Sequence, residues 1–480
     1  MKFKIALSKI TPLMLLAVTA PLAILLTLGT FYYGLNFGVL VFIILIGIPV
    51  AISVIIYPKF GIVILLTFAY VIALISRLGV HFPLGTVMDG LELLLILGFL
   101  IYQKQNPGLE KFKNTISYII LAWIGYNLLQ FFNPTAESRL AWVYTIRSVA
   151  AVMIMYFVFM TQIRTVNFVR LILKLWIGLA FFAALYAFKS EHLGFFQFEK
   201  DWLASDPNLS TLYFIAGHWR KSSIFSDPVA FSYNMVTSSI LCLTLMMNNM
   251  KVYKKIILGF LVVFFMLNML YSGTRGANVL LPAAIFLLAI LKFNYRVLGL
   301  SILGMIFLAI LVYMPTSNQN LIRFQSAFRP SDDPSFNLRG INQKRIQPFI
   351  QTHPFGGGLG ATGTWGERFA PNSYLAHFPP DSGYVRVAVE LGFVGLILFC
   401  TLMFTILKTG ITNYYKIKDP ELKGYCLAMV LIIFALNIGN YPQEALVQFP
   451  TSIYFYLFVA LINVTLILDK EKQQEELSKL

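Results

Sequence analysis

Residues 36–56 read NFGVLVFIILIGIPVAISVII, a stretch that is long enough to cross a bilayer and has no charged side chain. Similar stretches recur along the 480 residues, of which 58% are apolar and only 12% are charged, with a mean hydropathy of +0.74. A soluble domain carries about a quarter of its residues as charges. The composition therefore excludes a soluble enzyme and predicts an all-α polytopic membrane protein.

The apolar stretches predict about fourteen transmembrane helices in a single membrane domain, residues 1–480. The expected spans lie at about 11–29, 36–56, 60–76, 87–102, 116–132, 143–161, 169–188, 228–248, 255–272, 277–292, 296–314, 384–408, 424–439 and 450–468. The first span follows Lys2, Lys4 and Lys9 and extends to about Gly29. This is too long for the apolar region of a cleaved signal peptide, so we expect a transmembrane helix there.

Basic residues in alternate turns predict how the chain is oriented. The turns on one side carry Lys59, Lys104, Lys111, Lys113, Arg164, Arg170, Lys251, Lys254, Lys255, Lys292, Arg296, Lys408, Lys416, Lys418, Lys423, Lys470, Lys472 and Lys479. The positive-inside rule makes this side cytoplasmic, with both termini and the charged tail, 469–480. Two long periplasmic loops are then expected, 189–227 and 315–383. The second, between the eleventh and twelfth spans, is rich in aromatic residues, so we expect it to be structured, with a short helix near 339–351.

The expected outer face carries arginines where the inner face carries lysines. They are Arg77, Arg139, Arg147, Arg220, Arg275, Arg323, Arg329, Arg339, Arg345, Arg368 and Arg386. Lysine suffices as a topology signal, whereas the planar guanidinium binds phosphate or carboxylate oxygens two at a time. The excess favours an anion-binding site; the alternative is a set of scattered arginines near lipid headgroups. The net charge of +16 is divided between two membrane faces, so it does not predict nucleic-acid binding.

Ionisable residues within the expected spans collect near their outer ends. They are Asp89, Glu92, Arg147, Arg275 and Glu390. Charges in the bilayer are costly, so they mark function by default, although each one singly is as compatible with a role in stabilising the bundle. Transporters place their sites near the midplane on broken helices, and no such pair of spans is evident. The clustering therefore favours a site at the outer interface.

Short segments in the second half of the chain have more specific patterns. They read WRKSSIFSDP (219–228), YSGTRG (271–276), HPFGGGLG (353–360, preceded by Arg339), PDSGY (380–384) and ELGFVG (390–395). In this order, and with these positions relative to the spans, they resemble the bacterial O-antigen ligase and O-antigen polymerase superfamily of membrane glycosyltransferases. The resemblance covers about residues 220–400, and the first half of the chain is similar only in its hydropathy.

The resemblance implies a GT-C-like enzyme that transfers a glycan from undecaprenyl diphosphate to an acceptor hydroxyl at the periplasmic face of the inner membrane. It implies that Arg220, Arg275 and Arg339 hold the donor diphosphate, whose charge grows in the transition state. Arginines can do this without a metal, so no metal or cofactor is expected. The expected partners are the lipid-linked glycan, membrane lipids, and a hydroxyl acceptor such as a glycan or a lipid A-core.

Asp381 stands where the family's ligases carry a histidine in an H-N-x-Y-L stretch. This departure favours a polymerase-like or exopolysaccharide-type member. Asp381 also stands at the end of the large loop, where an acceptor hydroxyl would approach the donor, so it is the candidate base of an inverting reaction; His353 is the second candidate. The alternatives are a helix N-cap for Asp381 and structural roles for His353 and His377. Residues expected to support the site are Asp227, Tyr384, Glu390 and Arg147.

Two other classes of protein remain as alternatives. A transporter or flippase of a lipid-linked or anionic glycan is the runner-up, and charges lining a path across the midplane would distinguish it. A purely structural membrane scaffold is the third. The sequence leaves open whether the enzyme is a polymerase or a ligase, because the acceptor cannot be read from it.

Overall fold

A computed structural model describes residues 20–21, 23–24, 27–32, 34–79, 82–105, 108–215, 217–293, 295–317, 319–328 and 334–478. This part of the chain is almost entirely helical. Strands β1 (Phe214–Ile215) and β2 (His218–Trp219) form a two-stranded antiparallel pair with Phe214 opposite Trp219. The all-α class predicted from hydropathy is therefore confirmed.

Within the described residues, ten helices are long and apolar enough to cross a membrane. They are α4 (Pro58–Arg77), α5 (Leu84–Gln105), α6 with the 3-10 turn η2 (Thr115–Phe132), α7 (Arg139–Gln162), α8 (Val166–His192), α11 (Pro228–Met246), α12 (Val252–Tyr271), α18 (Gly383–Lys416), α19 (Pro420–Gly439) and α20 (Thr451–Leu477). Shorter apolar stretches lie in α3 (Leu35–Ile56), in η3 (Arg275–Val279) with α13 (Leu280–Leu291), and in α14 (Tyr295–Tyr313); the 3-10 helix η1 is Leu109–Phe112.

The expected spans from 36–56 onward each overlap one of these helices. The expected span 11–29 lies mostly outside the described residues, so the total of about fourteen spans stays a prediction. What the structure establishes is a multi-pass bundle of apolar helices.

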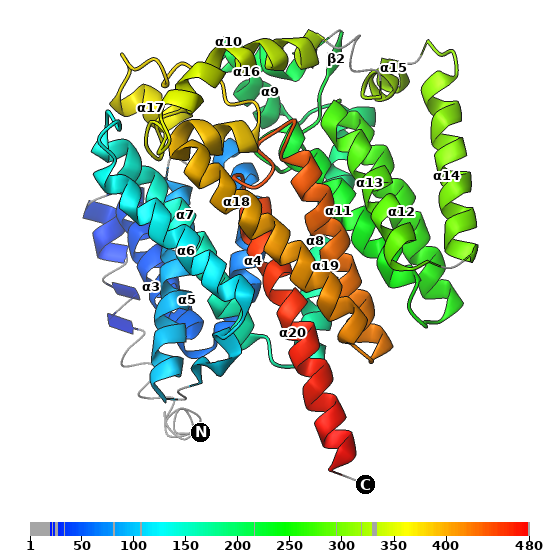
Figure 1. Cartoon of the computed structure of the whole chain (residues 1–480). Helices are drawn as coiled ribbons and strands as arrows, with labels where there is room; N and C mark the ends of the chain where they lie inside the picture. The colour runs from blue at the N-terminus through cyan, green and yellow to red at the C-terminus, as the bar shows by residue number, and fades with distance from the viewer. Residues whose placement is uncertain are drawn as a thin grey trace.

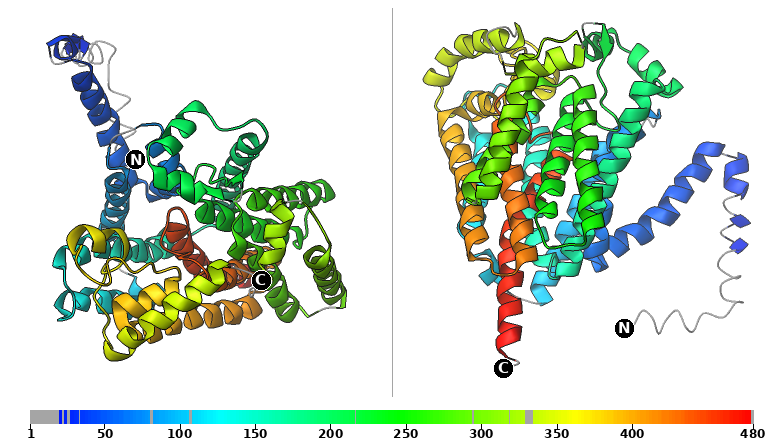
Figure 2. Two further views of the ribbon diagram at one scale, coloured as in Figure 1. Left: turned by 90° about the horizontal axis from the view of Figure 1, so that it is seen from above. Right: turned by 90° about the vertical axis from the view of Figure 1, so that its right-hand side faces the viewer.

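Three helices form the centre of the bundle. In their most apolar windows, 78% of α11, 78% of α19 and 89% of α20 is buried, against 22% of α12. The segment of α20 from Thr451 to Leu468 is apolar on all sides, which suits a helix that is surrounded by other helices. Seen from above, α20 lies near the middle of the molecule (Figure 2).

Five short helices gather at one end of the bundle, away from the C-terminus (Figure 1). They are α9 (Gln197–Ala204), α10 (Pro207–Tyr213), α15 (Gln319–Ser326), α16 (Pro334–Thr352) and α17 (Gly363–Phe369). We call this the cap end and the opposite one the C-terminal end. The helix expected near 339–351 is present as part of α16. On which side of a membrane the cap end lies remains a prediction from the charge pattern.

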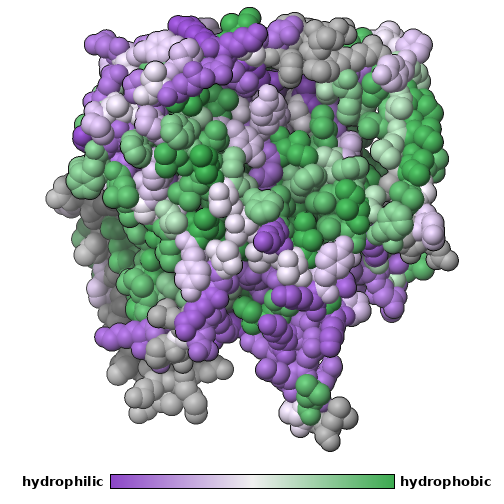
Figure 3. Space-filling view, viewed as in Figure 1, coloured by the Kyte–Doolittle hydropathy of each residue, from purple (hydrophilic) through white to green (hydrophobic). Residues whose placement is uncertain are grey.

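An apolar belt separates the two polar ends of the surface (Figure 3). On α12, for example, Ile256, Phe260 and Val263 are all more than half exposed. Large apolar side chains that face outward on a bundle of this kind contact lipid in a membrane. The belt therefore fits a chain that crosses a bilayer, with its irregular segments outside the hydrocarbon region.

Candidate functional site

A cavity of about 270 Å³ lies at the cap end, where three segments of the chain meet. Its lining comes from the chain leading into α11, the residues before α18, and the turn between α19 and α20: Leu212, Arg220, Asp227, Pro228, Val229, Ala230, Tyr233, Pro380, Asp381, Gln443, Glu444, Ala445, Gln448 and Thr451. Three residues selected from the sequence, Arg220, Asp227 and Asp381, therefore share one cavity although they are far apart along the chain.

Arg220 is held by the YSGTRG segment. Its Nε donates to the Ser272 carbonyl at 2.9 Å and its Nη2 to Thr274 Oγ1 at 3.1 Å. The backbone N–H of Lys221 also donates to the Tyr271 carbonyl at 3.0 Å. Two of the sequence motifs thus bind each other, and their contact orients the Arg220 side chain at the cavity wall.

Asp227 begins α11. Its Oδ1 accepts the backbone N–H groups of Val229 at 2.7 Å and Ala230 at 3.0 Å, and Pro228 occupies the first helical position. This is the arrangement of an N-cap followed by proline, which satisfies donors that the helix cannot satisfy itself. Asp227 thereby fixes the point where α11 begins.

Arg77, at the end of α4, organises the loop between Arg220 and Asp227. It is only 7% exposed; its Nη1 donates to the Ser223 carbonyl at 2.7 Å and its Nη2 to Ser222 Oγ at 3.0 Å. Its guanidinium also stacks over the Trp202 ring at 4.4 Å. Ser223 has a φ of +53°, a conformation that costs energy for a residue other than glycine and persists only when the surroundings hold it. The sequence showed Arg77 only as one more outer arginine.

Asp381 lies directly before α18 and is not its N-cap. The helix begins at Gly383, the N-cap position belongs to Ser382, and no side chain caps the helix. The Asp381 carboxylate instead lines the cavity, and its Oδ2 lies 3.5 Å from Asn342 Nδ2 of α16. The N-cap alternative derived from the sequence is therefore wrong, and the carboxylate is available to a ligand.

The other two arginines of the expected diphosphate site lie near the same cavity. Arg339 lies on α16, and Asn342 of the same helix lies 3.5 Å from the Asp381 carboxylate at the cavity. Arg275 begins η3 and is followed by Gly276, where an added Cβ would come within 3.2 Å of the Tyr233 hydroxyl oxygen. The segments that carry these two arginines and Arg220 thus converge on one region.

Glu444 is a charged residue of this region that sequence reasoning did not select, and its partner Arg386 appeared only among the outer arginines. Glu444 lines the cavity, and its Oε2 accepts from Arg386 Nη1 at 2.7 Å. Burial raises the pKa of Glu444 above its usual value, the Arg386 guanidinium opposes this, and the Glu390 and Asp381 carboxylates raise it further. Residues 58 apart in the sequence form this pair, so no local pattern could have revealed it.

The glycine-rich segment and the ELGFVG segment dock against each other. Gly392 has a φ of +69° inside α18, and an added Cβ would lie 2.0 Å from the Pro354 carbonyl oxygen. Gly356 has a φ of +72°, and a Cβ there would lie 2.4 Å from the Gly392 nitrogen. Only glycine permits these angles and this close approach, so these two glycines allow the loop to pack tightly against α18.

The Glu390 side chain completes this docking. It is 3% exposed, and it accepts from the Gly360 N–H at 3.0 Å, the Thr362 hydroxyl at 2.5 Å and Arg386 Nε at 3.1 Å. Arg386 therefore joins Glu390 to Glu444. The contacts of Glu390 fix the loop to α18 and connect it to the cavity through Arg386.

The remaining selected residues are not among those that line the cavity. His353 stacks on the Phe349 ring at 4.1 Å, and its Nδ1 lies 3.0 Å from the Phe349 carbonyl oxygen. Tyr384 donates to the Asn437 carbonyl at 3.1 Å. Arg147 pairs with Asp89 of α5, which joins two helices. His377 Nε2 lies 2.7 Å from the Pro371 carbonyl oxygen.

The cavity combines an arginine with carboxylates. Arginine nitrogens can hold an anionic group, and a carboxylate can accept a proton from a hydroxyl within hydrogen-bond reach. No group of three or more histidine, cysteine, aspartate or glutamate side chains that could hold a metal ion occurs in the described part of the chain. The arginine and the carboxylates of the lining suit anion binding next to proton transfer.

The comparisons with known proteins agree with this picture. Residues 260–400, which carry Arg275, Arg339, Asp381 and Glu390, match the family model described as O-antigen ligase. Together with the apolar helices, the match supports a membrane enzyme that processes glycans. The match supports placing the chain in the O-antigen ligase and polymerase superfamily, as the sequence motifs indicated. None of the curated proteins matches the chain.

Proposed function

We propose that the protein is an inverting, metal-independent glycosyltransferase of the bacterial inner membrane. It transfers a glycan from undecaprenyl diphosphate to an acceptor hydroxyl at the periplasmic face, with both termini in the cytoplasm. A lipid-linked donor enters laterally from the bilayer, so a site at the end of the spans suits it. The observation that carries the proposal is the meeting of Arg220 and Asp381 in one cavity next to the segments of Arg275 and Arg339.

The arginines supply the donor side of the reaction. As the bond between the sugar C1 and the diphosphate oxygen breaks, its electron pair moves to the diphosphate. Arg220, already oriented by Ser272 and Thr274, then stabilises the growing negative charge. Arg275 and Arg339 act on the same group. A guanidinium suits this role better than an ammonium because it meets two oxygens at once.

Asp381 supplies the acceptor side. The acceptor hydroxyl gives its proton to the Asp381 carboxylate while its oxygen forms the new bond to C1, on the face opposite the leaving diphosphate. Only modest help is needed, because a diphosphate bound by arginines is a good leaving group. Its position in the cavity and outside the N-cap leaves this carboxylate available for that task.

Among members of the superfamily, a polymerase that elongates a surface polysaccharide is the form we favour over a ligase. The motivating feature is the aspartate at 381, where ligases carry histidine. The glycan phenotype of a deletion strain tests this choice. Loss of long chains with single repeats retained identifies a polymerase, whereas accumulation of long lipid-linked chains identifies a ligase and contradicts our preference.

The transferase activity itself is tested with purified protein in proteoliposomes. The donor is the lipid-linked glycan extracted from the deletion strain, and the product is measured as glycan extended or moved to a lipid A-core acceptor, together with released undecaprenyl diphosphate. The wild-type protein is assayed with each acceptor, both in EDTA and with divalent metal added. If it releases no undecaprenyl diphosphate under any of these conditions, the proposed function is wrong.

A further inference from the structure

The turn between α19 and α20, residues 440–450, supplies a part of the cavity lining that no sequence motif identified. Gln443, Glu444 and Gln448 come from it. The turn contains neither lysine nor arginine, in contrast to the segment of Arg220. The residues before α11 therefore contribute Arg220 and the N-cap Asp227 to the cavity, and this turn and Asp381 contribute carboxylates and amides without a basic residue.

Glu444 has one oxygen engaged and one available. Arg386 donates to Oε2, while Oε1 has no hydrogen-bond partner among the described residues. Gln448 Oε1 accepts from Ser226 Oγ at 2.9 Å, which leaves its NH₂ group to donate to a ligand. A carboxylate oxygen and side-chain amides together accept from and donate to sugar hydroxyls, which are both donors and acceptors.

The turn is held in place before any ligand binds. Asn440 Oδ1 accepts the Ala445 N–H at 3.1 Å, and the Asn440 carbonyl accepts the Gly383 N–H at 2.9 Å. The second bond fastens the turn to the start of α18, two residues from Asp381. A subsite that is fixed in this way loses little conformational entropy on binding.

We infer that residues 440–450 form the acceptor subsite, in which Glu444, Gln443 and Gln448 bind the acceptor's terminal sugar while Asp381 faces its reactive hydroxyl. The inference rests on the proposed function and names its acceptor class: a sugar without a carboxylate, either neutral or amino-bearing. Arg386 is already paired with Glu444, and Arg220 is assigned to the donor, so the negative charge of a uronic acid would lie next to the Asp381 carboxylate and the second Glu444 oxygen without a basic partner of its own.

The test separates acceptor binding from chemistry in the proteoliposome assay. The acceptor is the free repeat released from the lipid by mild acid, which cannot act as a donor, or a lipid A-core extract, whichever the wild type uses. For Glu444→Gln we expect the acceptor KM to rise roughly 10-fold, because a charge-assisted hydrogen bond becomes a neutral one, while kcat and the donor KM change less than about 3-fold. Asp381→Asn should show the reverse, a loss in kcat.

Glu421→Gln is the matched control. It also removes the negative charge of a carboxylate that is paired with an arginine, Arg170, but this pair lies at the C-terminal end, away from the cavity. An unchanged acceptor KM for Glu444→Gln, or a rise in the donor KM instead, overturns the subsite. If Glu444→Gln fails to accumulate in the membrane, the double variant Gln443→Ala, Gln448→Ala replaces it, and the same rise in acceptor KM is required. Wild-type protein that uses neither acceptor contradicts the proposed function rather than the subsite alone.

The chemical class is tested independently by sugar analysis of the glycan that accumulates in the deletion strain. We expect the terminal, non-reducing sugar of the acceptor to be neutral or amino-bearing. A uronic acid at that position, with transfer intact, overturns the assignment of the acceptor class. Neither result changes the conclusion about the arginines, which contact the other substrate.

Discussion

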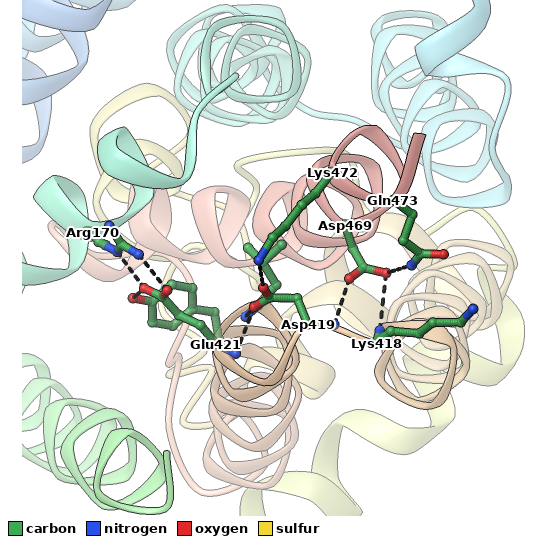
Figure 4. A network of polar contacts seen from close by, with 9 residues as sticks. Arg170, Lys418, Asp419, Glu421, Asp469, Lys472 and Gln473 are labelled. Atoms are coloured by element: carbon green, nitrogen blue, oxygen red, sulfur yellow. Dashed lines mark hydrogen bonds and ion pairs between the residues drawn. The ribbon is translucent and has the colours of Figure 1, made fainter. Parts of the chain in front are cut away.

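The two ends of the bundle both concentrate charged residues, but they neutralise them differently. At the C-terminal end, Glu421 accepts from Arg170 Nε at 2.5 Å and from Nη2 at 2.6 Å, and Asp469 accepts the backbone N–H of Asp419 at 2.8 Å and the Gln473 amide at 2.6 Å (Figure 4). Both carboxylates use both oxygens. At the cap end, Asp381 and Glu444 face a cavity, and Glu444 keeps one oxygen without a partner among the described residues.

The backbone is also regular at the C-terminal end and irregular at the cap end. A short turn joins α18 and α19 at the C-terminal end, with Asp419 as the N-cap of α19. At the cap end, α18 is broken at Gly392, Ser223 has a positive φ, and several short helices replace regular turns. Backbone strain together with charged groups that lack part of their hydrogen-bond partners is typical of a functional site. Charged groups whose oxygens all have partners are typical of contacts that stabilise the fold. The following predictions test that contrast.

The largest expected effect is in cysteine labelling, which tests on which side of the membrane each end lies and gives an all-or-none result. In a version without Cys242, Cys400 and Cys426, an impermeant thiol reagent added from the periplasm should label a cysteine at exposed Asn372 and spare one at exposed Lys418. Detergent permeabilisation should make the second site reactive, which controls for accessibility. If intact cells are labelled only at Lys418→Cys, the topology is the reverse of the predicted one and the cap end does not lie in the periplasm.

Arg220 should show the largest effect on catalysis. Arg220→Ala should lower turnover roughly 10²- to 10³-fold, as expected when one donor to a developing anion is lost. Arg220→Lys should fail nearly as badly, because an ammonium cannot reproduce the contacts to Ser272, Thr274 and a diphosphate together. Arg368→Lys, an exposed arginine of α17, is the control. Wild-type turnover from Arg220→Lys would show that the residue supplies only a positive charge.

Asp381 should come next. Asp381→Asn and Asp381→Ser should both lower kcat roughly 10²-fold, because neither side chain can take up the acceptor's proton. Thermal stability should stay near that of the wild type, since no helix cap is removed. Near wild-type kcat for Asp381→Asn in the proteoliposome assay would exclude Asp381 as the base and make His353 the first candidate.

The hydropathy of the sequence predicted the helices well because lipid exposure demands long apolar stretches. The site was harder to predict. Motif order indicated Arg220, Asp227 and Asp381, but the aspartate, serine and glycine of 381–383 are all common at helix starts, so local sequence could not tell which one holds the N-cap. The start of α18 is fastened by the hydrogen bond from Gly383 to Asn440, and its break at Gly392 lies against the glycine-rich loop; both are tertiary contacts.

Arg77 and Glu444 escaped sequence reasoning for a related reason. Arg77 bonds to residues about 146 positions away, and Glu444 pairs with a residue 58 positions away, so neither lies in a local pattern. Both also fall outside the matched segment, 260–400. The signal available for Arg77 was an arginine near the end of an expected span with no acidic neighbour in sequence. That signal does not identify the residues that the arginine contacts.

Arg77→Lys should have an intermediate effect. The ammonium retains the charge but cannot reach Ser222, Ser223 and the Phe225 carbonyl in the same fixed geometry. We expect roughly 10-fold lower kcat/KM for the donor and a lower melting temperature, because the loop that positions Arg220 loosens. Unchanged kinetics for the lipid-linked donor, despite lower stability, would show that the loop needs no help from Arg77 to place Arg220.

Asp419 should show the smallest effect, because it lies at the C-terminal end, away from the cavity. Its Oδ1 caps α19 through the N–H groups of Glu421 and Leu422, and Lys472 binds its other oxygen. Asparagine caps almost as well as aspartate, and an ion pair with an exposed lysine is worth about 0–1 kcal/mol, so Asp419→Asn should lose less than about 1 kcal/mol and no activity. Asp419→Ala, which also removes the cap, should cost about 0.5–2 kcal/mol.

The pH dependence of that difference can be predicted as well. Burial by itself raises the pKa of Asp419, but the hydrogen bond from Lys472 and those from the start of α19 outweigh it and hold the pKa below its usual value. A lowered carboxyl pKa means that the charged form stabilises the fold, so the gain is complete above the unfolded pKa of about 3.9 and is lost as the pH falls through the lower folded value. The melting temperatures of wild type and Asp419→Asn in detergent should therefore differ by a constant amount from pH 5 to pH 8. If the difference in melting temperature changes across that range, or if Asp419→Asn loses glycan transfer, then this end of the bundle does more than stabilise the fold.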